Sequence, residues 1–425
     1  MKFTSIIKSL LFLCAAFAVT AQARTPNITG FVRADGKPLS GVQVSDGKEI
    51  VTTDRNGHYE LVSDKQEGTV FITTPSGYVA ESRDNFQPGF WHGLKSQEQV
   101  PETYDINLTA QDQNRFALIF TTDTHLTNDT TKDDLLTYER LVMPRIRELA
   151  ADYGKDRPVY SFNLGDLSHE IYWYELGMPL DKVVDYVVRT GYPTLMYNIS
   201  GNHDNDGAVT GPDTDHRAAW LYRQTLGPAQ YAINIGNTHW VMLDNIIYKN
   251  IEGKGKKAKG IRGDRSYNVG FTQQQLDWLA KDLTSVADSM QVFICCHAPL
   301  LYPKNESGLL LTDHSQMDVL DQMLSRFEHV TVFSGHAHRN MYRTHQQYPR
   351  FSQYVLGATS GSMWNTSKHY QTKGEDASAA GECVANITDG TDPDIKYHTY
   401  IPGDPMFRAY DLNEVGRYYR TNPDV

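Results

Sequence analysis

Apolar and polar positions follow two patterns along the chain, and the change comes near residue 109. From residue 27 to about residue 109, short alternating segments are interrupted by turn-forming dipeptides such as Asp46-Gly47 and Asn56-Gly57. These dipeptides favour hairpins when they stand between β-branched residues. Their regular spacing predicts a small all-β sandwich with antiparallel strands.

After residue 109, apolar runs of strand length alternate with longer amphipathic segments. Strands are expected at residues 116–122, 159–163, 194–199, 240–243, 292–296 and 330–333. Helices are expected at residues 135–150, 179–189, 272–283 and 316–327. This alternation predicts an α/β layered domain, in which ligand-binding loops follow the carboxyl ends of strands.

The chain has 425 residues, which is more than one hydrophobic core usually organises, so we expect several domains. The change of pattern places the β-sandwich at residues 24–110 and the α/β domain at residues 111–365. The remaining sequence, residues 366–425, is polar and rich in Gly and Asp, and we expect it to form a C-terminal accessory segment.

Residues 1–23 have the three parts of a secretory signal peptide. Lys2 and Lys8 flank a short basic region, residues 10–19 are apolar, and Ala21-Gln22-Ala23 fits a cleavage site. The apolar run is too short to span a bilayer, and no other apolar stretch of about 18 residues occurs. We therefore expect an exported protein, in the periplasm, on the cell surface or secreted, with no transmembrane segment in the mature chain.

The formal net charge of the chain is -11 at pH 7. Binding to the phosphate backbone of nucleic acids depends on clustered Lys and Arg side chains. The acidic balance therefore argues against a nucleic-acid partner and against long polyanionic substrates.

Five of the strand-like runs are followed at once by residues that commonly bind metals. In chain order these motifs are Asp123-Thr124-His125, Gly165-Asp166, Gly201-Asn202-His203-Asp204, His297-Ala298-Pro299 and Gly335-His336-Ala337-His338. Taken singly, an Asp could cap a helix and a His could be a hydrogen-bonded core residue. Together, the mixture of oxygen ligands and imidazoles at strand ends predicts a site for Mn, Fe or Zn.

The motif order D-x-H, GD, GNHD, H-x-P and GHxH resembles that of the calcineurin-like metallophosphoesterases over residues 115–364. The resemblance implies a two-sheet α/β sandwich that binds two divalent metal ions at its mouth. It implies that one ion is held by Asp123, His125 and His338, the other by Asn202, His297 and His336, and that Asp166 bridges both. It also implies that His203 donates a proton to the leaving oxygen, with Asp204 holding its far nitrogen.

Two divalent ions about 3.5 to 4 Å apart can bind and acidify a bridging water, which gives a hydroxide nucleophile at neutral pH. They also neutralise charge on the phosphoryl oxygens. We therefore expect hydrolysis of a small phosphomonoester or phosphodiester. The alternatives are a nuclease or nucleotide-processing phosphoesterase, and an inactive exported binding protein that has kept the fold.

Two subgroups of the family differ from this sequence. Purple acid phosphatases carry a tyrosine three residues after the bridging aspartate, whereas this chain has His169 there. Protein Ser/Thr phosphatases carry GDxVDRG and GNHE, whereas this chain has Gly165-Asp166-Leu167-Ser168-His169 and GNHD. The layout is most similar to exported bacterial members of the family with a β-sandwich in front and a small C-terminal domain behind.

The N-terminal segment resembles the prealbumin-like or carboxypeptidase-regulatory-like modules that precede many exported bacterial enzymes. The resemblance rests on residues such as Gly30-Phe31-Val32 and Gly57-His58-Tyr59. It implies a fold and no chemistry. Because every expected ligand follows residue 109, we expect turnover of a small substrate to survive removal of residues 24–109.

Overall fold

The computed structural model describes residues 25–95, 97–131, 134–253, 258–303, 306–360 and 378–399. Residues 1–23, the expected signal peptide, lie outside the described residues, as do most residues of the expected accessory segment. Within the part of the chain that is described, no helix has the length and apolar character needed to cross a membrane.

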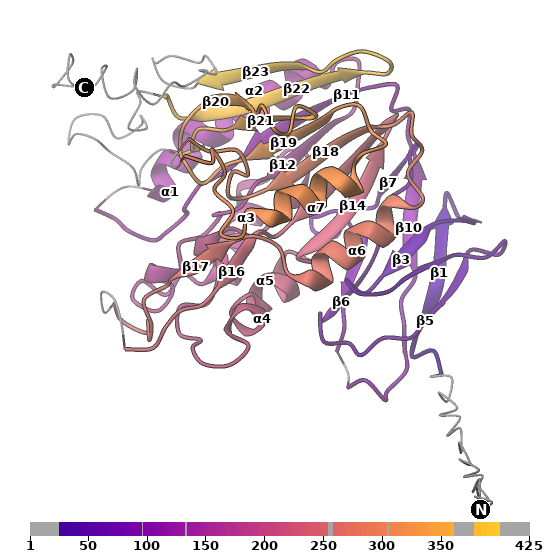
Figure 1. The fold of residues 1–425 in the computed structure, drawn as a ribbon, viewed down its shortest axis with the longest axis horizontal. Coiled ribbons are helices and arrows are strands. Elements are labelled where there is room, and N and C mark those ends of the chain that lie inside the picture. Colours follow the sequence, from indigo (N-terminus) through magenta and orange to yellow (C-terminus); the bar gives the residue numbers. More distant parts are fainter. Residues whose placement is uncertain are drawn as a thin grey trace, which may run out of the picture.

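The N-terminal module is a two-sheet β-sandwich (Figure 1). One sheet contains β2 (Lys37–Pro38), β1 (Ile28–Ala34), β10 (Ile106–Ala110) and β7 (Tyr78–Ala80), with β5 (His58–Leu61) and β9 (Glu102–Thr103) also paired to β1. The other contains β4 (Ile50–Thr52), β3 (Gln43–Ser45), β6 (Thr69–Ile72) and β8 (Trp91–Gly93). The sandwich was expected to be antiparallel, but β1 pairs in parallel with both β9 and β10.

The α/β domain is built on two further sheets that face each other. The first has the order β13 (Leu195–Asn198), β12 (Val159–Asn163), β11 (Arg115–Thr121), β22 (Gly381–Thr388) and β23 (Asp394–Thr399). The second has the order β14 (Gln230–Ile235), β15 (Thr238–Leu243), β18 (Gln291–Cys296), β19 (Val330–Ser334), β21 (Phe351–Val355) and β20 (Met341–Thr344). A separate hairpin pairs β16 (Ile246–Tyr248) with β17 (Tyr267–Val269).

The strand alternation along β11 shows how the layers are held together. Phe116, Leu118 and Phe120 point into the core between the two sheets, where Phe120 stacks on Phe333 of β19 with ring centroids 4.4 Å apart. Ile119 points the other way and packs against the helical layer. Period-two alternation with both faces buried is what a central strand of a layered α/β sandwich requires. The expected fold class, an α/β two-sheet sandwich behind a small β-sandwich, is confirmed.

Helices cover the outer faces of both sheets (Figure 1). The α-helices are α1 (Asp134–Thr137), α2 (Met143–Tyr153), α3 (Leu180–Thr190), α4 (Thr214–Ala218), α5 (Trp220–Thr225), α6 (Gln273–Leu283) and α7 (Ser315–Met323). Between α1 and α2 lies a π-helical segment, η1 (Tyr138–Val142), and two 3₁₀ turns are η2 (Glu170–Tyr172) and η3 (Asn202–Asp204). The helix expected at residues 135–150 is therefore one continuous helical path with a π segment inside it.

The first sheet of the α/β domain extends beyond its expected end. The sequence placed the end of the α/β domain at residue 365, yet β22 and β23 lie inside the expected accessory segment and extend the first sheet. β22 runs antiparallel to β11, with Phe116 opposite Ile387 and Phe120 opposite Cys383. Burial of these residues between the layers draws this part of the chain into the catalytic core.

The N-terminal module and the catalytic domain share one hydrophobic core. The same cluster of buried side chains includes Val44 and Phe71 of the module and Trp278 and Leu279 of α6. A backbone hydrogen bond from the amide N–H of Asn234 to the carbonyl of Thr74, 2.8 Å long, adds to this junction. The module is therefore packed into the catalytic domain rather than connected to it by a free linker.

Candidate metal centre

The expected ligands lie together at the carboxyl ends of five strands from both sheets. β11 is followed by Asp123 and His125, β12 by Asp166, β13 by Asn202, β18 by His297, and β19 by His336 and His338. All seven side chains are at least partly buried. The structure thus brings together every residue that the motifs singled out, from positions 215 residues apart in the sequence.

The backbone at these positions is unusual. Five of the seven expected ligands have positive φ angles between 50° and 66°, namely Asp123, His125, Asp166, His336 and His338. A residue with a side chain costs about 1 kcal/mol or more in this left-handed region, so the surrounding contacts must hold it there. Strain of this kind concentrates at functional sites.

Two glycines allow the ligand loops to approach one another closely. A Cβ atom on Gly201 would lie 2.1 Å from Oδ1 of Asp166, and one on Gly335 would lie 1.9 Å from Oγ1 of Thr122. Both contacts are far inside van der Waals distance. The glycines before Asn202 and His336 are therefore needed for close packing of the loops.

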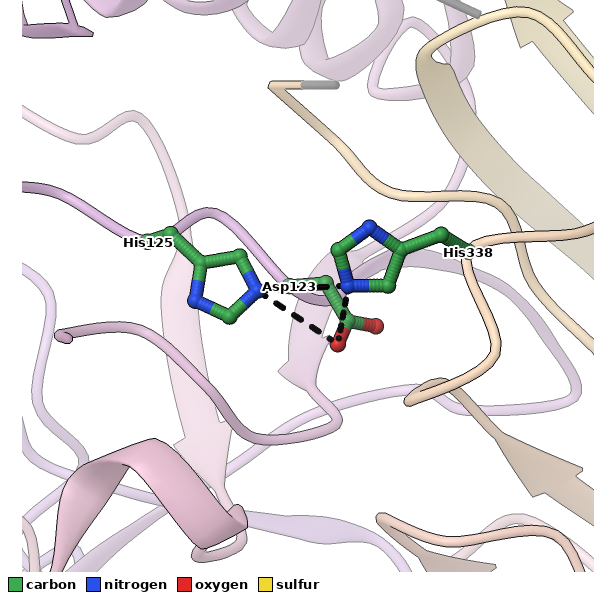
Figure 2. Close-up of side chains that lie close together, drawn as sticks. All are labelled: Asp123, His125 and His338. Atoms are coloured by element: carbon green, nitrogen blue, oxygen red, sulfur yellow. Dashed lines mark hydrogen bonds and ion pairs between the residues drawn. The ribbon is translucent and has the colours of Figure 1, made fainter. Parts of the chain in front are cut away.

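The first group of donor atoms consists of Asp123, His125 and His338 (Figure 2). Nε2 of His338 lies 3.1 Å from Oδ1 of Asp123 and 3.2 Å from Nε2 of His125. Nε2 of His125 lies 3.8 Å from the same Asp123 oxygen. One carboxylate oxygen and two ring nitrogens therefore converge on a common point.

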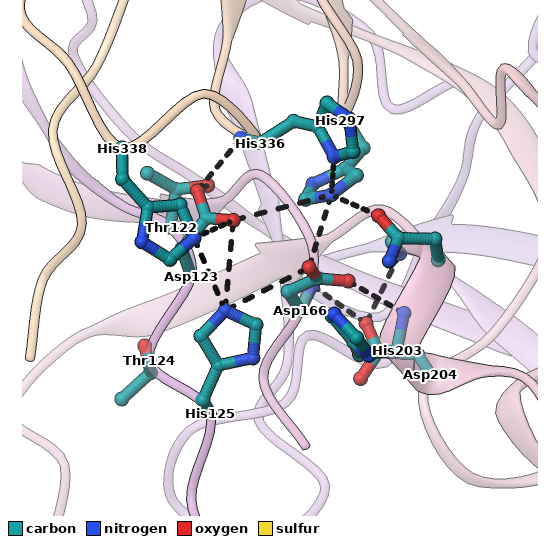
Figure 3. A network of polar contacts seen from close by, with 12 residues as sticks. Thr122, Asp123, Thr124, His125, Asp166, His203, Asp204, His297, His336 and His338 are labelled. Atoms are coloured by element: carbon teal, nitrogen blue, oxygen red, sulfur yellow. Dashed lines mark hydrogen bonds and ion pairs between the residues drawn. The ribbon is translucent and has the colours of Figure 1, made fainter. Parts of the chain in front are cut away.

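The second group consists of His297 and His336, which lie near the carboxylate of Asp166 (Figure 3), together with Asn202. Nε2 of His297 lies 3.1 Å from Oδ1 of Asn202, 3.2 Å from Oδ2 of Asp166 and 3.3 Å from Nδ1 of His336. Oδ2 of Asp166 also lies 3.8 Å from Nε2 of His125, in the first group. Asp166 is thus placed between the two groups.

Hydrogen bonds fix which oxygen of each carboxylate faces the imidazoles. Oδ2 of Asp123 accepts from the hydroxyl of Thr122 at 2.7 Å and from the backbone N–H of His336 at 2.8 Å. Its Oδ1 is buried and has no hydrogen-bond partner among the described residues. Oδ1 of Asp166 accepts from the backbone N–H of His203 at 2.7 Å. The second oxygen of each carboxylate is left for another ligand.

The ring of His297 is oriented in the way metal-binding histidines usually are. Its Nδ1 lies 2.8 Å from the backbone carbonyl of Leu164 and donates to it, which leaves Nε2 to face the donor group. Burial disfavours a charge on His297, but the carboxylates of Asp166 and Asp123 outweigh burial and raise its pKa to about 10. The two carboxylates therefore attract a positive charge to this point.

Burial also acts on the other charged and titratable groups of the centre. It lowers the pKa of His125 and of His336 to about 3, which keeps both rings neutral, as metal ligands must be. Burial opposes ionisation of Asp166 and Asp123, but the neighbouring histidines outweigh it and hold both carboxyl pKa values below their ordinary value. Anionic carboxylates and neutral imidazoles are the protonation states that cations require.

The spacing of the donors fits bound cations. Two ligands at about 2.1 Å from one metal are roughly 3.0 to 3.4 Å from each other in octahedral or tetrahedral geometry. The shortest donor separations in both groups, 3.1 and 3.2 Å, lie in that range. The clustered His and Asp residues suggest two metal ions. The assignment of each ligand to one ion stays a prediction.

The structure corrects the predicted partner of His203. Its Nδ1 lies 2.6 Å from Oε2 of Glu170, whereas the carboxylate of Asp204 accepts from backbone N–H groups. Burial lowers the pKa of His203, but the carboxylates of Glu170 and Asp166 outweigh burial and raise this pKa to about 9. A ring nitrogen of His203 lies within 4.8 Å of donor atoms of His125 and Asp166. Glu170 therefore holds the imidazole beside the candidate centre.

Asp204 instead ties two ligand loops together. Its carboxylate accepts from the backbone N–H groups of Asp166 at 2.8 Å, Ser168 at 2.9 Å and Gly201 at 3.0 Å. The hydroxyl of Ser168 donates to it at 3.0 Å. With both oxygens occupied by these donors, the carboxylate positions the backbone of Asp166 rather than the ring of His203.

Glu170 was not predicted from the sequence, because Asp204, directly after His203, was expected to be the partner of the imidazole. The available signal was position, since Glu170 follows Asp166 by four residues and lies in the same loop. A carboxylate that is 1% exposed beside a histidine has to be paired. That burial could be seen only in the structure.

Comparison with known proteins gives one family match and several distant structural similarities. Residues 26–111 match the family MetallophosN, the N terminal of calcineurin-like phosphoesterase. No curated protein matches the chain.

Three similar solved structures share little sequence identity with the chain. A dimetal phosphatase from Danio rerio is 14% identical, with 69% of this chain and 99% of that chain covered and a TM-score of 0.40. The structure of PhoD is 10% identical, with coverage of 94% and 97% and a TM-score of 0.42. A putative 5'-nucleotidase from Staphylococcus aureus is 14% identical, with coverage of 72% and 58% and a TM-score of 0.37.

The family match covers the N-terminal module, and the paired donor groups lie in the domain that follows it. Carboxylate, carboxamide and imidazole ligands at the ends of strands from two facing sheets were expected from the motif order. Residues 26–111 are therefore similar to the N terminal of calcineurin-like phosphoesterase, and the two donor groups lie where the motif order of that family predicts metal ligands.

Proposed function

We propose that the protein hydrolyses a small phosphate monoester or diester, using two divalent cations bound by the paired donor groups. The observation that supports this most strongly is the position of Asp166, whose Oδ2 faces His297 at 3.2 Å and His125 at 3.8 Å. A carboxylate between two sets of donor side chains is suited to bridging a pair of cations. Export of the protein is part of the proposal and rests on residues 1–23 alone.

The ligand chemistry indicates which cations to test. Mixed carboxylate, carboxamide and imidazole donors suit Mn, Fe or Zn, whereas no cysteine is among the expected ligands. When bound, such a pair supplies a water of lowered pKa and neutralises charge on the phosphoryl oxygens. Asp123, Asp166 and the histidines would hold the cations. Their hydrogen bonds set the orientation of these side chains.

His203 is proposed to protonate the leaving oxygen. Its ring stands beside the centre, with a centroid 5.0 Å from that of His125, and its Nδ1 is held by Glu170. One nitrogen is thus used for positioning and the other is left for proton transfer. A general acid in this position typically contributes on the order of 10² to 10⁴ in rate, most for basic leaving groups.

A metal-dependent activity panel tests the proposal. Metal-free protein is assayed with an aryl phosphate monoester and an aryl phosphate diester after addition of Mn, Zn or Fe, with Asp166→Asn as the control. We expect hydrolysis of at least one substrate, dependent on added metal and strongly reduced in the control. Two bound ions per chain without hydrolysis of either substrate would favour the alternative, an inactive exported binding protein.

A further inference from the structure

Arg265 stands just before β17, in a backbone conformation that several contacts fix. Its φ angle is +57°, and its backbone N–H donates to Oδ1 of Asn250 at 2.8 Å. The same buried Asn250 side chain donates to the carbonyls of Gly207 at 2.9 Å and Val209 at 2.7 Å. A residue with a side chain is strained in the left-handed region, so these contacts must hold Arg265 where it is.

The guanidinium of Arg265 binds the carboxylate that orients His203. Nη1 of Arg265 lies 2.9 Å from Oε1 of Glu170, and Oε2 of Glu170 lies 2.6 Å from Nδ1 of His203. The Glu170 side chain is 1% exposed and that of Arg265 is 30% exposed. A buried carboxylate needs partners on both oxygens, so Arg265 leaves Glu170 fixed, with its second oxygen directed at the imidazole.

From this arrangement, we infer that Arg265 is a positioning residue that acts on the reaction through Glu170 and His203. The inference deepens the proposed function and rests on it, because it assigns a role in proton donation to the leaving group. It also links the β16–β17 hairpin to the catalytic centre. The same hairpin places the hydroxyl of Tyr267 3.3 Å from Nε2 of His336, on the metal-binding side.

A different role for Arg265, direct binding of the substrate phosphate, makes different predictions. Loss of a phosphate contact would weaken binding and raise KM for all phosphate esters. Loss of a positioning contact would lower kcat, mainly for substrates whose leaving group needs a proton. It would also have no effect once His203 is absent, because the two residues would act as one unit.

The test is a double-mutant cycle of Arg265→Met and His203→Ala, measured on an alkyl phosphate and on a nitrophenyl phosphate. We expect Arg265→Met alone to lower kcat about tenfold or more on the alkyl ester and much less on the nitrophenyl ester. In the His203→Ala background it should change kcat less than about twofold. Arg262→Met, in the same loop with an exposed side chain, is the matched control and should behave as wild type.

Metal content and thermal stability show whether the variants are folded, and Arg265→Lys, which keeps the charge, serves as a second variant. An equal loss in both backgrounds, or a rise in KM with unchanged kcat, would overturn the inference. An NMR arm does not depend on activity. In zinc-loaded protein with ¹⁵N-labelled histidine, Arg265→Met should shift the resonance of the His203 ring N–H that faces Glu170, and Arg262→Met should not.

The two arms separate this inference from the proposed function. A wild-type protein that binds metal but hydrolyses no phosphate ester would refute the proposed function, while the NMR arm would still report on the contact between Arg265, Glu170 and His203. An unchanged His203 resonance in Arg265→Met would refute the positioning role, whatever the activity.

Discussion

The indole N–H of Trp278, in helix α6 of the catalytic domain, donates a hydrogen bond to the hydroxyl oxygen of Ser45 in the N-terminal sandwich at 3.0 Å. Trp278 is fully buried, and its ring centroid lies 6.2 Å from that of Phe71, also in the sandwich. Nearby, the side-chain amide of Gln230 donates to the carbonyl of Gly47 at 2.8 Å. The sandwich therefore completes part of the core of the catalytic domain.

Removal of residues 24–109 should destabilise the catalytic domain. The position of the ligands after residue 109 suggested that turnover would survive, but deletion would expose Trp278 and its buried neighbours to water. Loss of this much apolar burial costs several kcal/mol, which is comparable to the whole stability of a domain. We expect the truncated chain to be insoluble or to melt far below the full protein in calorimetry. A soluble truncated chain with a wild-type melting temperature and activity would contradict this.

Substitution of Trp278 separates the two contributions at this junction. Trp278→Phe keeps an aromatic ring but removes the donor to Ser45, which should cost about 1 kcal/mol. Trp278→Ala also leaves a cavity, and should cost about 3 to 5 kcal/mol. Denaturant unfolding of both variants measures these costs. Ser45→Ala is the matched control, and together with Trp278→Phe it should cost less than the sum of the two single changes.

Metal analysis can count the ions that each ligand holds. Because Asp166 lies between the two donor groups, Asp166→Asn should lower the content of both ions. His125→Ala should lower the content of mainly one ion. His125 belongs to the first donor group, where its Nε2 lies 3.2 Å from Nε2 of His338. Elemental analysis after gel filtration gives the number of ions per chain. Two ions per chain and full activity in Asp166→Asn would show that the ligand assignment is wrong.

Glu170 and Asp204 should give opposite results, although both are buried carboxylates near His203. Glu170→Gln should keep the metals and lower kcat mainly on alkyl phosphates, because it disturbs the ring of His203. Asp204→Ala removes the acceptor for three backbone N–H groups and should lower stability and metal content, with similar losses on alkyl and aryl substrates. Kinetics on both substrate classes and metal analysis distinguish the two patterns. If Asp204→Ala kept the metals and lost activity mainly on alkyl phosphates, while Glu170→Gln lost metal, Asp204 would be the partner of His203.

The convergence of the expected metal ligands could be predicted from the sequence because each motif is short and directly follows an apolar strand. Adjacent strands bring their carboxyl ends to the same edge, so contiguous motifs converge without knowledge of side-chain packing. Glu170 and Arg265 could not be predicted in this way. They are 95 residues apart, and their contact depends on how the β16–β17 hairpin folds back over the site.

Strand β22, near the C-terminus, escaped prediction for a different reason. β22 contains Glu382, which is fully buried in the structure and breaks the apolar pattern of the sequence GECVANIT. A buried carboxylate inside a central strand is rare, so the segment is read as polar. Only the pairing of β22 with β11 shows that it belongs to the catalytic sheet.

The stability of the metal-free protein should depend on pH through Asp244, which follows β15. Burial, and then the charge of Asp215, raise the pKa of Asp244 to about 7, from an ordinary value of 3.8. A carboxyl whose pKa is raised by folding is protonated in the folded state, so its stabilising effect is full below about pH 4. This stabilising effect is lost as the pH rises from about 4 to about 7. In that range the unfolded chain has given up the proton and the folded protein still holds it.

Asp244→Asn removes this titration and keeps an oxygen to accept the hydrogen bond from the N–H of Ile246 at 2.9 Å. The free energy of unfolding of the variant, relative to wild type, should therefore increase between pH 4 and pH 7, by at most about 4 kcal/mol. Denaturant unfolding is measured at several pH values on metal-free protein, because bound cations would lower the pKa of a carboxyl so close to His297. The exposed Asp277→Asn is the control and should show no such trend. A constant difference between Asp244→Asn and wild type across this range would mean that Asp244 stays ionised in the folded protein.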